Sequence, residues 1–361
     1  MVVVRVLVFA AGLAVVLVAI GSAIKTIVVP RAVSSSITRA VFVLLGNLIE
    51  LFLRGRKEFR SRDRVLAYFA PVGLLLLPGV WVTLVIFGYS FMFWAIGSGT
   101  WSTAFTESGS SMLTLGFVPP SGPGEVVLAF TEATLGLGIV ALLIAYLPSI
   151  YAAFGRREQL VGQLEVRAGT PPSASVLLAR YEVIGLLHNI DTELYPKWEA
   201  WFVDVEESHT SLPVLVFFRS PQPARSWITA AGCILDTASI SHSTVAGRSS
   251  AHAALMIRTG FLCLRRIADY FGLPYEVDVG QDSPISVTRR EFDLLCVELV
   301  AAGIELRADR DQAWRDFVGW RANYDAVLVG IAGMISAPPG RWTSNGVARF
   351  HPRIFRRTVP H

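Results

Sequence analysis

Two long stretches of the chain carry no charged side chain, and they constrain the fold more than any other feature. The first lies between Arg64 and Glu107, and the second lies between Glu132 and Arg156. A helix needs roughly 20 apolar residues to cross the hydrocarbon core of a bilayer, which is about 30 Å thick. Both stretches are long enough, so we expect each to contain a membrane-spanning helix, at 65–97 and at 125–154.

Two further apolar segments precede these spans. Residues 6–24 lie between Arg5 and Lys25, and their length favours a retained anchor helix over a signal peptide. Residues 37–53 carry a narrow polar stripe at helical spacing, which fits either a short span or an amphipathic helix in the membrane interface. We prefer four spans with the N-terminus inside. If 37–53 lies flat, three spans and an outside N-terminus follow.

Basic residues gather where the apolar spans end. Six lie between Arg54 and Arg64, and Arg156 and Arg157 follow the last span. Basic clusters could bind nucleic acid, but clusters that abut apolar spans are typical of the cytoplasmic side of a membrane protein. We therefore expect no nucleic-acid partner and a multi-pass protein of the cytoplasmic membrane. The scarcity of lysine among its 32 basic residues favours a GC-rich, bacterial genome.

After Arg156 the chain reads as a soluble domain. The whole sequence is 53% hydrophobic and 17% charged, against about 25% charged residues in average soluble domains, and the deficit lies in the first half. Apolar periodicity predicts helices in the second half, and a buried strand or helix at 212–218. The expected helices are 174–187, 251–270, 291–304 and 312–335. We predict three domains, at 1–64, 65–159 and 160–361, the last cytosolic and mostly helical.

No catalytic or metal-binding pattern is visible in that second half. Cys233, Cys263 and Cys296 show no spacing typical of zinc ligands or of a disulfide framework. The histidines and serines form no nucleophile motif, and the glycines form no phosphate-binding loop. We therefore expect neither an enzyme nor a resident cofactor.

The segment between the two strong spans carries the chemistry. Residues 100–112 predict a helix too short to cross the bilayer, followed by a Gly-containing extended strand at 113–118. Irregular backbone at membrane depth is tolerated only where protein buries it or water bathes it. The sequence therefore predicts a re-entrant loop between the spans.

Such a loop can replace the water around a cation with rings of backbone carbonyl oxygens when four chains converge. Thr114 supplies a hydroxyl, Gly116 can reach the dihedral angles that turn a carbonyl inward, and Phe117 is the bulky side chain that packs outward. Leu115 packs behind the strand. A short helix that directs its C-terminal carbonyls at the centre favours a cation there.

These residues resemble the potassium-channel pore, whose signature is Thr-x-Gly-(Tyr/Phe)-Gly. The resemblance covers 65–159 and implies an all-α pore module of outer helix, pore helix, filter and inner helix in a homotetramer, with extra N-terminal membrane helices. It implies that Thr114, Leu115, Gly116, Phe117 and Val118 form the filter, the first three coordinating the permeating cation. It also implies that Gly138 and Pro148 are hinge or kink positions of the inner helix.

Two residues depart from the signature. Val118 replaces the second glycine, and Pro119 follows it and favours an extended conformation at Val118. The outermost cation site is therefore altered, and we expect a path for K⁺ or Na⁺ with changed or reduced potassium selectivity. The alternative is a membrane-anchored sensor or scaffold with a degenerate, non-conducting hairpin.

Glu107 and Glu132 are the candidate acids of the pore. Glu132 lies inside a span, where an ionisable side chain is costly and often functional. Two interpretations stay open: Glu132 braces the pore helix or attracts cations, or it lies at the outer mouth and is hydrated. Glu125 reads as an ordinary acid at a helix start.

Overall fold

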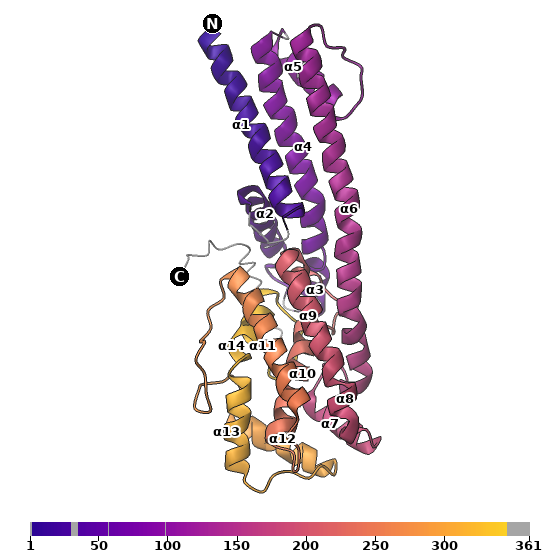
Figure 1. The fold of residues 1–361 in the computed structure, drawn as a ribbon, viewed down its shortest axis with the longest axis vertical. Coiled ribbons are helices and arrows are strands. Elements are labelled where there is room, and N and C mark those ends of the chain that lie inside the picture. The colour runs from indigo at the N-terminus through magenta and orange to yellow at the C-terminus, as the bar shows by residue number, and fades with distance from the viewer. Residues whose placement is uncertain (1, 30–34, 57, 98, 345–361) are drawn as a thin grey trace. The chain divides into compact units, whose positions relative to one another are not determined.

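The structure, a computed structural model, describes residues 2–29, 35–56, 58–97 and 99–344, and this part of the chain is helical (Figure 1). Two isolated β-bridges are the only strand-like pairings among these residues. Four helical stretches are long and apolar enough to cross a membrane: α1 (Val2–Ile27), α2 (Ser36–Leu53), Phe59–Ile96 and α6 (Pro123–Ala168). The expectation of an all-helical fold is confirmed for these residues, and four of the helical stretches are compatible with a membrane protein.

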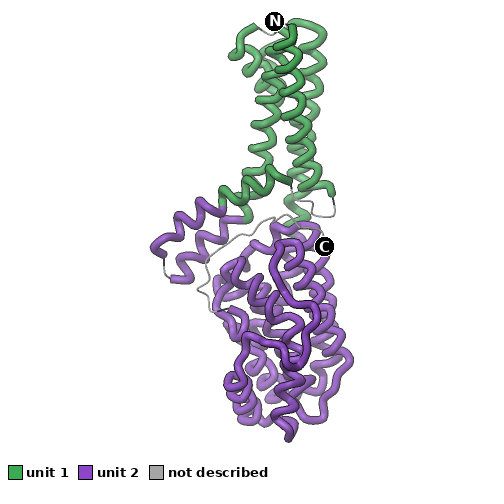
Figure 2. Tube along the Cα trace, turned by 90° about the vertical axis from the view of Figure 1, so that its left-hand side faces the viewer, with its two compact units in different colours: residues 1–45, 70–151 green, residues 46–69, 152–361 purple. Residues whose placement is uncertain are grey.

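The chain divides into two compact units, coloured separately in Figure 2. Unit 1 holds residues 1–45 and 70–151, and unit 2 holds residues 46–69 and 152–361. Residues 46–69, which the sequence groups with the N-terminal membrane part, associate with the C-terminal helices. The 46-residue helix α6 contributes to both units.

Helix α1 packs antiparallel against α4 (Phe69–Ile96) in unit 1. A Cβ atom on Gly12 would lie 2.4 Å from the carbonyl oxygen of Gly88, so the two backbones touch there. Further along, the indole Nε1 of Trp81 donates to the hydroxyl of Ser22 at 3.0 Å. Later residues of α1 therefore lie beside earlier residues of α4, as expected for antiparallel helices. Glycine at such a contact allows the close approach typical of membrane helices.

This register decides where α2 runs. The hydroxyls of Thr26 and Thr38 lie 2.7 Å apart, which ties the end of α1 to the start of α2. The ring of Phe42 then covers Gly73, near the start of α4. Helix α2 therefore stays at the end of the bundle where α1 finishes and α4 begins. Helix α2 is itself long and apolar enough to cross a membrane, as the four-span prediction requires.

Helices α4, α5 (Trp101–Met112) and α6 follow the order expected for residues 65–159. Proline interrupts neither long helix, since Pro78 lies within α4 and Pro148 within α6. Helix α6 continues well past the predicted end at residue 154. It stops at Gly169, whose φ of 78° is favourable for glycine alone.

Unit 2 is built of shorter helices around α10 (Trp227–Ser243), of which nearly every residue is buried. The segment 212–218, predicted as a strand or helix, forms a 3₁₀ helix. The predicted helix 312–335 is two helices separated at residues 322–324. The remaining elements are α3 (Phe59–Leu66), α7 (Ala174–Val183), η1 (Leu187–Asn189), α8 (Ile190–Glu193), α9 (Tyr195–Ser211), η2 (Pro213–Phe217), α11 (Ala251–Phe271), α12 (Arg289–Ala301), α13 (Arg310–Arg321) and α14 (Asp325–Met334).

Candidate functional site

Helix α5 is the short helix expected before the filter segment. The side chain of Thr100 caps its start by accepting a hydrogen bond from the Thr103 amide at 3.3 Å. Its 12 residues rise about 18 Å at 1.5 Å per residue. A helix of this length cannot cross the hydrocarbon core.

The end of α5 differs from the extended strand that we expected. The amide of Leu115 donates to the carbonyl of Ser110 at 2.8 Å, and the amide of Thr114 donates to that of Ser111 at 3.1 Å. These two bonds form a Schellman motif, which places Thr114 in the left-handed position where glycine is usual. Its φ of 55° is rare for a β-branched residue. Thr114 therefore ends the helix and does not begin a strand.

The residues after Thr114 are open to the surroundings of the single chain. Leu115 and Phe117 are each 60% exposed, and Gly116 has a φ of 71° with no atom near the position of a Cβ. The amide of Val118 donates to the hydroxyl of Ser110 at 3.3 Å and returns the segment to α5. Residues 114–117 of the predicted filter thus form one continuous exposed loop, and Val118 is half-buried.

Helix α6 supports α5 at two points one turn apart. A Cβ on Gly136 would lie 2.3 Å from the carbonyl oxygen of Met112, so the end of α5 packs directly against the backbone of α6. One turn earlier, the hydroxyl of Ser108 lies 2.5 Å from Oε1 of Glu132. The pairs 108/132 and 112/136 share the i, i+4 spacing of one helix face.

The two candidate acids are both buried. Glu107 is 3% exposed and Glu132 is 0% exposed in the single chain. Because Glu132 faces α5, the interpretation in which it is hydrated at the outer mouth does not hold in this structure, and the bracing interpretation fits. Glu125 accepts a bond from the Ser121 amide at 2.7 Å, as expected of an acid at a helix start.

The predicted hinge residues lie in an unbroken helix. No atom lies within 4 Å of a Cβ built on Gly138, and Pro148 continues α6 without ending it. The structure shows one conformation of α6, so the roles of Gly138 and Pro148 as hinge or kink stay predictions.

In unit 2, Arg157 fastens the C-terminal part of α6. Its side chain is fully buried and donates to the carbonyls of Leu215 and Phe218, each at 2.8 Å. It also pairs with Glu158 at 2.9 Å and lies 3.1 Å from Nε2 of His209. The bonds to Leu215 and Phe218 therefore fasten this part of α6 to the 213–219 segment, whereas the pair with Glu158 lies within α6.

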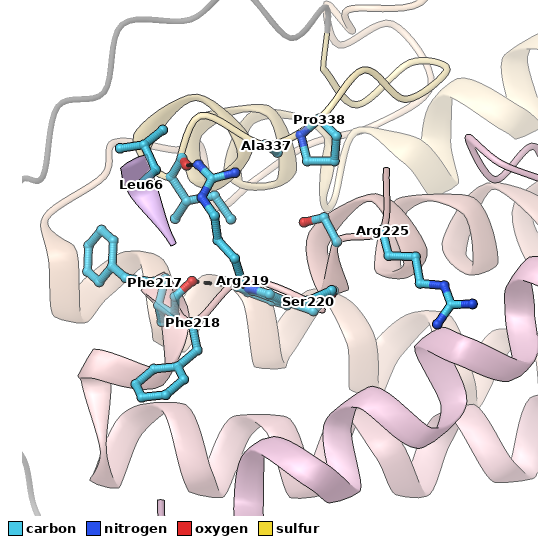
Figure 3. A pocket seen from close by; sticks show the side chains of 12 residues that line it. Leu66, Phe217, Phe218, Arg219, Ser220, Arg225, Ala337 and Pro338 are labelled. Atoms are coloured by element: carbon cyan, nitrogen blue, oxygen red, sulfur yellow. Dashed lines mark hydrogen bonds between the residues drawn. The ribbon is translucent and has the colours of Figure 1, made fainter. Parts of the chain in front are cut away.

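The 213–219 segment also holds the chain just before α4. Arg219 pairs with Asp63 at 2.5 Å and donates to the carbonyls of Ile335 and Ser336. The ring of Phe217 packs edge-on against Phe69, the first residue of α4, at 5.2 Å between centroids. Figure 3 shows Arg219 reaching toward the loop that carries Ala337, while Arg225 points away from it. One short segment therefore contacts both the beginning of α4 and the C-terminal part of α6.

The core of unit 2 contains a second buried arginine. Arg321 pairs with Asp236 and with Asp325, at 2.8 Å for the latter, and donates to the carbonyl of Trp342. The hydroxyl of Tyr324 donates to Asp236 at 2.8 Å. This network joins α10, α13 and α14. Within the described ranges, no cluster of three or more metal-ligating side chains occurs.

No family model, curated protein or solved structure matches the chain.

Sequence reasoning missed the residues that support the candidate site. Ser108 and Gly136 matter because of what lies opposite them, and neither carries a motif. The spacing of Glu132 and Gly136 was visible, but the residues they face depend on how α5 packs. Arg157 was assigned to a basic membrane flank, whereas the structure buries it completely.

Proposed function

We propose that this protein is a homotetrameric channel for monovalent cations, with residues 114–118 from four chains lining the narrowest part of the path. The observation that supports this most is the exposed loop between two spans that begins at Thr114. A loop with this much apolar surface needs a protein partner at membrane depth. Further copies of the same loop are a partner that symmetry supplies.

The chemistry of the loop suits K⁺ or Na⁺. These ions are stripped of water where carbonyl and hydroxyl oxygens converge in rings. Thr114 carries a hydroxyl, and Gly116 has the positive φ that a tight, inward-turned backbone requires. Val118 and Pro119 replace the outer part of the potassium-channel signature, so we expect weaker discrimination between the two ions.

Gating in this proposal passes through α6. The buried Arg157 ties its cytosolic end to the 213–219 segment, which also contacts Asp63 before α4 and Phe69 at the start of α4. A change in unit 2 that shifts this segment would therefore reach both spanning helices of the hairpin. Bending at Gly138 or Pro148 is the motion that we expect to open the path.

One observation favours a second function, a membrane-anchored scaffold that does not conduct. The carbonyl of Met112 rests on Gly136, and those of Ser110 and Ser111 accept the two bonds of the Schellman motif. These three carbonyls are then less available to stabilise a cation beyond the end of α5. A scaffold would need α5 to pack against α6, but it would not need free carbonyl groups at the C-terminal end of α5.

Reconstitution separates the two. The purified chain should be tetrameric in detergent by light scattering, and vesicles should pass K⁺ and Na⁺ down their gradients. Thr114→Ala and Gly116→Ala should abolish flux while the tetramer persists. A monomer or dimer, or a tetramer without flux in bilayer recordings, would contradict the channel and support the scaffold.

A further inference from the structure

Glu132 is the most deeply buried acid of unit 1. It lies on α6, facing α5, and none of its surface is exposed. Its Oε2 atom meets no hydrogen-bond donor among the described residues. A buried carboxylate that lacks a cation or several donors is strongly destabilised. The question is therefore whether Glu132 is an ionised carboxylate or a neutral carboxylic acid.

The hydrogen bonds around Ser108 point to the answer. Its hydroxyl lies 2.5 Å from Oε1 of Glu132 and 2.9 Å from the carbonyl oxygen of Ile86 on α4. A serine hydroxyl has one proton to donate, but it can accept two hydrogen bonds. If Glu132 is a carboxylate, Ser108 faces two acceptors and satisfies only one. If Glu132 is a carboxylic acid, it donates to Ser108, Ser108 donates to Ile86, and every short contact contains a proton.

The charged and titratable neighbours of Glu132 agree with the neutral form. From α5 it is faced by Glu107, whose negative charge opposes a second one nearby. From α4 it is faced by Tyr89, whose hydroxyl donates to Thr131 at 3.1 Å. Within the described part of the chain, no arginine or lysine forms an ion pair with Glu132.

We propose that Glu132 is a positioning residue held as a neutral carboxylic acid, which donates the hydrogen bond that locks α5 between α6 and α4. The chain Glu132–Ser108–Ile86 joins three helices through one serine. Because Gly136 contacts Met112 one turn further on, the lock fixes the last turn of α5 before Thr114. This inference rests on the proposed channel only for its flux measurements.

The test compares two substitutions with opposite consequences. In Glu132→Gln the side-chain amide can still donate to Ser108, so the lock persists without a titratable group. In Glu132→Ala the donor disappears, and Ser108 keeps only its bond to the Ile86 carbonyl, so α5 is no longer tied to α6 through Ser108. A carboxylate that attracts cations predicts that both substitutions weaken conduction, because both remove its charge.

We expect Glu132→Gln to keep conductance and the K⁺/Na⁺ permeability ratio within about twofold of the unsubstituted protein. Glu132→Ala should shift that ratio and lower flux well beyond twofold, because the last turn of α5 before Thr114 loses its tie to α6. Glu125→Gln is the matched control, since it removes an acid from the start of the same helix. Equal losses in Glu132→Gln and Glu132→Ala would overturn the proposal.

A spectroscopic measurement does not depend on conduction. Infrared spectra of the purified protein at neutral pH should contain the carbonyl stretch of a protonated carboxylic acid, and Glu132→Gln should remove it while Glu125→Gln keeps it. If that band is missing from the unsubstituted protein, Glu132 is ionised and the proposal fails. If the protein does not conduct at all, the channel fails, and the infrared result still decides the state of Glu132.

Discussion

The helices of the two units meet through different groups. In unit 1, α1 meets α4 at Gly12 and Gly88, and α5 meets α6 at Gly136, so that backbone touches backbone. In unit 2, the cores around Arg157 and Arg321 contain buried charges with carboxylate and carbonyl partners. Lipid removes the hydrophobic drive between spanning helices, so close packing must hold them together. A domain in water buries apolar surface and can tolerate costly polar networks, provided that every group is paired.

Arg321→Ala is the strongest test of whether buried charge networks stabilise unit 2. The substitution leaves Asp236 and Asp325 buried without their cation, and we expect it to lower the free energy of unfolding of unit 2 by about 3–5 kcal/mol. Denaturation by urea in detergent, followed by circular dichroism, measures this, because urea leaves membrane helices folded. Arg315→Ala, from the same helix and bonded only to Gln312 among the described residues, should change it by less than about 0.5 kcal/mol. If the two variants unfold alike, the buried network does not stabilise unit 2.

Gly136→Ala tests the packing of unit 1. Its new methyl group would meet the backbone of Met112 at 2.3 Å, and backbone cannot move aside as a side chain can. We expect a loss of about 1–3 kcal/mol from overpacking, measured by unfolding in mixed micelles. Gly138→Ala, where no atom lies within 4 Å, should be neutral or gain up to about 1 kcal/mol from helix propensity. A destabilised Gly138→Ala variant would show that free space at this position does not predict tolerance.

His209 provides a pH test that belongs to unit 2 alone. Burial, and next the guanidinium of Arg157, hold the pKa of His209 well below its usual 6.5. The unfolded chain binds a proton below pH 6.5 and the folded chain does not, so the folded state loses stability as pH falls from 6.5 toward 5. One such group contributes about 1.4 kcal/mol per pH unit. Urea unfolding at several pH values measures the slope.

The control for this slope is a second histidine. His209→Gln should flatten the dependence between pH 6.5 and 5, whereas His252→Gln, at an exposed position, should keep it. An unchanged slope in His209→Gln would assign the effect to another group.

Much of the architecture could be predicted because it depends on local pattern. The charge-free stretches predicted α4 and α6, and the Ser/Thr-rich segment predicted α5 to within one residue at its start. The course of α2 could not be read, since its polar stripe suits both interfacial and spanning helices. The support of α5 was equally hidden, because Ser108 and Gly136 acquire meaning only when two helices, distant in sequence, lie in register.

The end of α5 shows where local pattern and structure disagree. Threonine is a poor residue for the left-handed position of a Schellman motif, yet Thr114 occupies it with a φ of 55°. Such backbone strain costs about 1–3 kcal/mol and is concentrated at functional sites. The strained residue is also the one whose hydroxyl the proposed cation path would use. The sequence pattern showed the hydroxyl but not the strain.

Thr114→Gly separates these two properties at the smallest expected change in stability. Glycine adopts a positive φ without a steric penalty, so the variant should unfold at a free energy higher by about 1 kcal/mol, measured in mixed micelles beside Gly136→Ala. It removes the hydroxyl, so ion flux should fall although the protein is more stable. A gain in stability with unchanged flux would show that the hydroxyl is not used, and that the strain at Thr114 serves the packing of α5. A loss of stability would show that the Thr114 side chain makes a favourable contact that outweighs its strain. The contrast between the units would then be weaker, because a helix end in unit 1 would depend on a side-chain contact as well as on close backbone packing.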